Sequence, residues 1–267
     1  MIGFNTESNT SLLQQVQNKQ ESILEKLSSG KRINSAAYGA AAQQIIDRLT
    51  TQVEGNRQSI SNAFDGVSLT QVAEGGLVGI NQDVNRIREL SVQSGNGLLS
   101  ESDRQAIQTE VTQLQENITQ TIEQTRFAGK SLLSIDGNID FQVGANSGQK
   151  IGVATQDVTA SFNDILNVDL STAQGAEDAL AIAYDAREFV GSAMADLGAT
   201  QNRFESAARN LTQTDINVSS ARSRIQDTDF AQAASENVAA DILSQTSLAV
   251  QGMANQQQGQ VLSLLNG

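Results

Sequence analysis

The chain contains no cysteine, histidine, proline or tryptophan among its 267 residues, and only 4% of the residues are aromatic. Without cysteine and histidine, disulfides, typical zinc sites and nucleophile–imidazole pairs cannot be built. A compact domain of this length normally holds more aromatic volume in its core. The absence of proline leaves helices free to run without a break. These absences predict a narrow helical structure that is not an enzyme and needs no cofactor or metal.

The charge is strongly negative, since 30 acidic residues face 17 basic ones and the net charge is −13. Nucleic acid and anionic membranes are therefore poor partners. No run approaches the roughly 18 apolar residues that span a bilayer. Residues 1–20 also lack the basic and apolar regions of a secretory signal. We expect no nucleic-acid partner, no membrane insertion, and either a cytoplasmic protein or export by a route that reads no such signal.

Apolar residues recur with helical spacing through the first half of the chain. A helix is expected from about Ser11 to Ser28, followed by a long helix over about 36–94 in which apolar residues repeat every seven positions. A third helix, capped by Ser100 or Ser102, is expected to reach about Phe127. The narrow apolar seam of the first helix is formed by Leu13, Val16, Ile23 and Leu27.

The second half begins with a different pattern and then returns to helix. Alternating apolar and polar residues predict a β-hairpin over about 139–155, and the polar segment 156–175 is expected to be loop with short elements. A long helix follows over about 176–224. A last helix, capped by Asp227 or Asp229, runs to Leu265. Its apolar face carries Val238, Ile242, Ala249 and Met253.

This order of elements predicts a mainly α fold. Both chain ends form a long antiparallel coiled-coil bundle, with a small hairpin in the middle and with the N- and C-terminal helices paired. Two helices alone cannot bury the end of the chain, "QVLSLLNG", because neighbouring positions point in different directions around a helix. Exposing such side chains costs about 1.5–3 kcal/mol each. We therefore expect burial against other copies, through a head-to-tail contact that builds a filament. The terminal residues concerned are Val261, Leu262, Leu264 and Leu265.

Five segments stand out in order along the chain: "LSSGKRINSA" (27–36), "RIRELSVQSGN" (86–96), "LGATQNRFESAARNL" (197–211), "SSARSRIQDTDFA" (219–231) and "VLSLL" (261–265). Together they resemble bacterial flagellin. The resemblance implies a filament subunit for swimming motility, exported unfolded through the flagellar type III apparatus to the cell exterior. It implies an inner core domain of residues 1–35 and 226–267 and an outer-shell domain of residues 36–225. About 40 residues separate the two halves, so no variable outer domains are expected.

The same resemblance implies partners and further sites. The expected partners are other flagellin copies, the flagellar cap and hook-junction proteins, and a flagellin export chaperone. Recognition by the flagellin-sensing Toll-like receptor would involve Arg86, Leu90, Gln93 and Glu110. Switching between filament supertwists would involve the hairpin, where backbone freedom comes from Gly144, Gly148 and Gly152. The candidate O-glycosylation sites are Thr159, Ser161 and Ser171.

Two other functions share the terminal helices. One is a hook–filament junction protein, and the other is a monomeric secreted protein that acts as a helical adhesin or immune ligand. Self-association separates the filament subunit from the monomeric protein, because the terminal helices of a filament subunit depend on their neighbours for burial.

Overall fold

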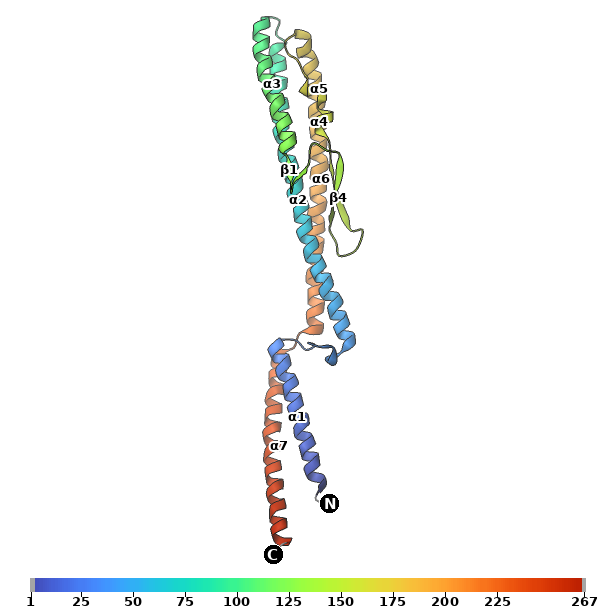
Figure 1. Ribbon diagram of the computed structural model, residues 1–267, viewed down its shortest axis with the longest axis vertical. Helices are drawn as coiled ribbons and strands as arrows, with labels where there is room; N and C mark the ends of the chain where they lie inside the picture. The colour runs from blue at the N-terminus through green and yellow to red at the C-terminus, as the bar shows by residue number, and fades with distance from the viewer. Residues whose placement is uncertain (1–2, 266–267) are drawn as a thin grey trace. The chain divides into compact units, whose positions relative to one another are not determined.

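The structure is a computed structural model. It describes the backbone of residues 3–265 and the side chains of residues 11–37, 39–257 and 259–260. Long helices dominate it, as predicted: α1 (Gly3–Ser29), α2 (Ala40–Ser94), α3 (Glu101–Gln124), α6 (Ala173–Gln226) and α7 (Phe230–Leu265). Between α3 and α6 lie two antiparallel strand pairs and two short helices (Figure 1). The chain divides into two compact units, one of residues 1–53 with 216–267 and one of residues 54–215.

The first unit holds the paired terminal helices. Helices α1 and α7 pack together and run antiparallel, since the amide of Thr228 donates to the carbonyl of Gly30 at 3.1 Å where α1 ends and α7 begins. Asp229 caps α7, because its carboxylate accepts from the amides of Ala231 and Gln232 at 2.9 and 3.2 Å. The predicted pairing of the chain ends is therefore confirmed, and Asp229 is the capping residue.

The second unit is a bundle of α2, α3 and α6, which lie side by side in Figure 1. One continuous apolar core joins these helices to the strands and the short helices. Its fully buried members include Ile80, Ile118 and Phe162. Small residues on α6, such as Ala179 and Ala183, are also fully buried, which lets the helices approach closely.

The hairpin consists of β3 (Gly137–Gln142) and β4 (Lys150–Thr155), close to the predicted bounds. Its strand β3 docks on the bundle through Phe141, whose ring meets that of Phe204 edge-on with the centroids 5.4 Å apart. The side-chain amide of Asn62 on α2 donates to the carbonyl of Gln142 at 2.9 Å. An apolar and a polar contact together hold the hairpin on the helices.

The segment after the hairpin is ordered by side chains from α3. It contains α4 (Val158–Ser161) and α5 (Asn163–Leu166), consistent with the expected loop with short elements. The side-chain amide of Gln115 donates to the backbone carbonyls of Ile165 and Val168. The side-chain oxygen of Gln108 accepts from the backbone amide of Leu170 at 2.6 Å. Backbone groups of an irregular segment are satisfied in this way by glutamines on the neighbouring helix.

Two predicted helix ends are wrong. The second long helix begins at Ala40 rather than at residue 36, after a short 3₁₀ turn over Ala36–Tyr38. Helix α3 ends at Gln124 because Phe127 belongs to a short strand pair, β1 (Arg126–Phe127) with β2 (Lys130–Ser131). The two residues between these strands, Ala128 and Gly129, have φ values of 49° and 80°. Positive φ at both positions is the geometry of a two-residue hairpin turn.

The predicted division into domains stays a prediction. Its boundaries, at residues 35 and 226, fall near the connection that follows α1 and the connection that precedes α7. The boundaries between the two compact units fall within the residue ranges of α2 and α6. At the predicted boundary, the amide of Arg32 donates to the carbonyl of Gln226 at 2.6 Å, and the guanidinium of Arg32 donates to the carbonyl of Ile225 at 2.8 Å.

Candidate assembly surface

The two helices contribute different kinds of side chain to the seam between α1 and α7. On α1 it is formed by Leu13, Val16, Ile23 and Leu27, of which Val16 and Ile23 are 9% and 2% exposed. The facing residues of α7 recur every three or four positions and are small or polar: Ala233, Asn237, Ala240, Ser244 and Ser247. The amide of Gln20 adds a hydrogen bond of 2.7 Å to the carboxylate of Asp241. Contact with α1 thus uses the least apolar face of α7.

The opposite face of α7 carries large apolar side chains that nothing in the described chain covers. Val238, Ile242 and Met253 are 59%, 60% and 59% exposed, and Ala249 lies on the same stripe. At about 100° per residue, this stripe points away from the seam with α1. Leu243, Leu248 and Val250 are also exposed, on the flanks. A helix that is apolar on several faces is typical of one that is surrounded by other helices.

The residues predicted to form the polymerisation core therefore fall into three groups. Leu13, Val16, Ile23 and Leu27 lie in the seam within the chain. Val238, Ile242, Ala249 and Met253 lie on the exposed face, which we call the α7 stripe. Helix α7 reaches Leu265, but the side chains of Val261, Leu262, Leu264 and Leu265 lie outside the described residues.

Sequence reasoning missed the flanking residues Leu243, Leu248 and Val250. A single stripe with seven-residue spacing does not include them. The sequence did carry a signal for them, because α7 contains more large apolar residues than a single seam with α1 can bury.

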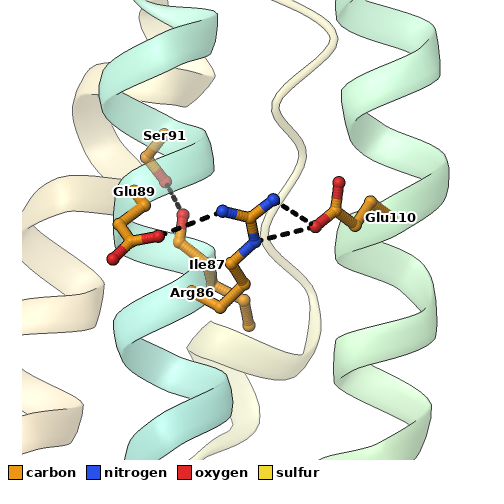
Figure 2. Close-up of polar contacts among 5 residues, drawn as sticks. All are labelled: Arg86, Ile87, Glu89, Ser91 and Glu110. Atoms are coloured by element: carbon orange, nitrogen blue, oxygen red, sulfur yellow. Dashed lines mark hydrogen bonds and ion pairs between the residues drawn. The ribbon is translucent and has the colours of Figure 1, made fainter.

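The Arg86 cluster lies on the second unit (Figure 2). The guanidinium of Arg86 lies between two carboxylates, at 2.8 Å from that of Glu110 on α3 and 3.1 Å from that of Glu89 on α2. The guanidinium donates hydrogen bonds to the carboxylates of Glu110 and Glu89, and these bonds, the one to Glu110 first, raise the pKa of Arg86 above its usual value. About half of the Arg86 side chain and 43% of that of Glu110 are exposed, so a partner could reach the cluster.

Leu90 does not belong to that surface. It is 2% exposed and forms part of the core of the second unit, so it does not share the exposed surface of Arg86. Its position on α2 turns it toward the bundle rather than toward solvent. Gln93 is exposed, one turn beyond Glu89. The structure thus brings Arg86 and Glu110 together and leaves Leu90 beneath the surface.

The three hairpin glycines have different surroundings. Gly148 has a φ of 85°, which suits glycine in the turn between the strands. A Cβ at Gly144 would lie 2.1 Å from the side-chain oxygen of Gln149, and one at Gly152 would lie 2.6 Å from the side chain of Asn138. Close approach therefore favours glycine at Gly144, where an added Cβ would also meet the Cβ of Gln149, whereas at Gly152 it would meet only the end of the Asn138 side chain, which can move aside.

The candidate glycosylation sites lie between the hairpin and α6. Thr159 and Ser161 are exposed on α4, and Ser171 is partly buried. The amide of Thr159 donates to the capping carboxylate of Asp157 at 3.0 Å, and the hydroxyl of Ser161 donates to the carbonyl of Asp157. The hydroxyls of Thr159 and Ser161 are accessible to a modifying enzyme.

Two other kinds of site are absent from the described residues. No group of three or more acidic, histidine or cysteine side chains gathers there in a way that could hold a metal ion. None of the helices in that part of the chain is long and apolar enough to cross a membrane.

A mainly helical chain whose terminal helix pair exposes a large apolar stripe belongs to the class of helical proteins that bury such a stripe against a protein partner. Comparison with known families gives the particular one. A model described as the bacterial flagellin N-terminal helical region matches residues 4–137, and one described as the bacterial flagellin C-terminal helical region matches residues 180–265. The chain belongs to the bacterial flagellin family.

Individual relatives agree along nearly the whole chain. A flagellin of Bacillus subtilis is 37% identical over 279 residues, which cover 91% of each protein. A flagellin of Halalkalibacterium halodurans is 36% identical, covering 93% of this chain and 92% of the relative. A flagellar filament 30.7 kDa core protein of Treponema maltophilum is 36% identical, covering 91% of each. The two halves are joined directly by residues 138–179, so the chain is a short flagellin without outer domains.

Solved structures share the fold. Flagellin of Bacillus cereus aligns with a TM-score of 0.52 at 23% identity and covers 61% of this chain and 94% of that chain. A Vibrio parahaemolyticus protein described as flagellar hook-associated aligns with a TM-score of 0.61 at 14% identity, covering 71% of this chain and all of that chain. At such identities the likeness concerns the fold alone, so it does not favour the hook-junction alternative.

Flagellin is a structural protein, and this chain is a structural subunit of the flagellar filament, which lies outside the cell. Assembly with copies of itself is therefore its activity. The monomeric alternative is not favoured.

Proposed function

We propose that the α7 stripe is the surface through which neighbouring subunits bury their terminal helices in the filament core. The observation that carries this proposal is the 59–60% exposure of Val238, Ile242 and Met253 on the face opposite α1. Burying a large apolar side chain contributes about 1.5–3 kcal/mol, so several such residues supply a strong assembly contact. The family membership supports a second copy as the partner.

The experiment is reassembly of purified, heat-dissociated chain on short filament seeds, followed by electron microscopy. A variant ending at Asn237 loses the whole α7 stripe together with the apolar residues that follow it, and it is compared with the full chain. We expect filaments from the full chain and none from the truncated one. Filaments from both would mean that assembly does not need the α7 stripe. Filaments from neither would contradict the proposed function.

We also infer the remaining roles from family membership. The subunit acts structurally rather than as an enzyme. It is exported unfolded by the flagellar type III apparatus with a flagellin export chaperone, and it meets the cap and hook-junction proteins during filament growth. The hairpin takes part in supertwist switching, since a docked two-stranded element offers a contact with two arrangements. Thr159, Ser161 and Ser171 are candidate acceptors for O-glycosylation.

Recognition by the flagellin-sensing Toll-like receptor is proposed through Arg86, Gln93 and Glu110. Arg86 and Glu110 form a charged pair on one exposed surface of α2 and α3. We expect the monomer to activate cells that carry this receptor, and Arg86→Ala to lower its potency at least about tenfold, as loss of a charged anchor does. Arg187→Ala, an exposed arginine of α6, serves as the control. Equal potency of the wild type and Arg86→Ala would contradict the proposal.

A further inference from the structure

The turn between α2 and α3 is fixed by hydrogen bonds from several directions. Arg104 is 8% exposed, and its guanidinium donates to the carbonyl of Ser94 and, at 3.2 Å, to that of Asn96. The amide of Leu98 donates to the side chain of Asn96 at 3.1 Å. Ser100 and Asp103 form a capping box at the start of α3. A buried cation bonded to two carbonyls holds the turn in one conformation.

Leu98 projects from this fixed turn and is 93% exposed. The next most exposed large apolar side chain in the described chain is Tyr184, at 63%. Most exposed apolar residues of the second unit lie along a helix, whereas Leu98 lies in the turn that joins α2 to α3, which we call the tip. The fixed turn holds this side chain outward, where another surface can contact it.

The same unit carries an apolar groove between α2, β4 and α6. Its cavity volume is about 350 Å³. The floor is formed by residues that are themselves buried, among them Leu69, Leu77, Val153 and Leu197. Thr200 and Arg203 of α6 lie at its polar edge. The floor and volume suit one branched aliphatic side chain and the turn that carries it.

The tip of a chain cannot reach the groove of the same chain. Helix α2 ends at Ser94, and at 1.5 Å per residue this is about 25 Å beyond Leu77. The tip and the groove therefore meet only between two copies that are shifted along the helix direction. A contact between two different surfaces of identical subunits does not close on itself and extends into a filament.

We propose that Leu98 of one subunit inserts into the groove of a neighbouring subunit. This contact rests on the filament function and adds a specific interface to it. Charge orients the pairing: Glu101 follows Leu98 on the first turn of α3, and the edge of the groove carries Arg203 and, about two turns away on α6, Asp196, so Glu101 would lie on the Arg203 side. Among the side chains that the structure describes, neither Glu101 nor Arg203 forms an ion pair within the chain. Opposite charges at the rim of an interface fix its orientation.

The first test is the critical concentration for elongation from wild-type seeds. Burying one leucine corresponds to roughly a tenfold to hundredfold change in an association constant. Leu98→Asp should therefore raise the critical concentration at least about tenfold, whereas Leu98→Met, which keeps the apolar volume, should elongate normally. Both variants should fold as the wild type does, because Leu98 makes little contact within the chain. Normal elongation of Leu98→Asp would overturn the contact while wild-type assembly kept the filament function intact.

The second test uses the absence of cysteine, which makes introduced thiols the only ones present. Filaments of Leu98→Cys/Thr200→Cys should give a ladder of linked chains after mild oxidation. The matched pair Leu98→Cys/Asn202→Cys should give none, because Asn202 points to another side of α6 at the same height. Equal ladders from the two pairs, or linkage by Leu98→Cys alone, would overturn the proposed contact.

Discussion

Ile242→Asp should abolish filament formation at concentrations where the wild-type chain assembles completely. The side chain is 60% exposed and lies at the middle of the α7 stripe. In the free subunit an aspartate there is solvated and costs little. In a filament it would be buried among apolar side chains of neighbouring copies, and burying an unpaired charge is strongly unfavourable. Seeded elongation followed by light scattering measures the effect.

The control for this variant is Gln232→Asp, which places the same charge on the flank of α7 that already carries Glu236, about 80° around the helix from Ile242. We expect it to assemble much more readily than Ile242→Asp. Circular dichroism of the two free variants should agree, since neither side chain lies in the seam with α1. If both variants assembled like the wild type, the α7 stripe would not be the assembly surface.

The architecture could be predicted from the sequence because the spacing of apolar residues indicates helices directly. The seven-residue repeats of α2 and α6, the alternation in the hairpin and the capping residues are all local signals. The short β1–β2 pair escaped prediction, since Ala128 takes a positive φ that its residue type does not favour. Its conformation is visible only once the backbone is built.

The candidate sites were harder to predict because they depend on which face of a helix is turned outward. Leu13 and Val238 belong to equally apolar stripes, yet one lies in the seam between α1 and α7 and the other is exposed. Leu90 likewise follows Arg86 by one turn, but it is buried in the bundle. Helical spacing shows which residues share a face of a helix. Whether that face is buried against another helix or exposed to solvent depends on how the other helices pack.

A single ring ties together three elements of the second unit. Phe204 of α6 is fully buried and meets Phe141 of β3 edge-on. On α2 it packs over Gly66, where a Cβ would lie 2.4 Å from the ring. Glycine at this position lets the backbone of α2 approach the aromatic ring directly.

Phe204→Ala should therefore lower the free energy of unfolding of the second unit by about 3–5 kcal/mol, as removal of a buried phenylalanine does. Urea unfolding of the free subunit, followed by circular dichroism, measures this change. Phe64→Ala is the control, because Phe64 lies on α2 but is 57% exposed. Its loss should change the free energy of unfolding by less than about 0.5 kcal/mol.

Gly66→Ala tests the same contact from the other side. The added methyl group collides with the ring, and such overpacking costs about 1–3 kcal/mol. In a Phe204→Ala background the ring is absent, so the same substitution should cost almost nothing, and the two effects should be far from additive. An equal cost of Gly66→Ala in both backgrounds would mean that the helix glycine is not held by this ring, and that α2 and α6 are held together by the aliphatic core alone.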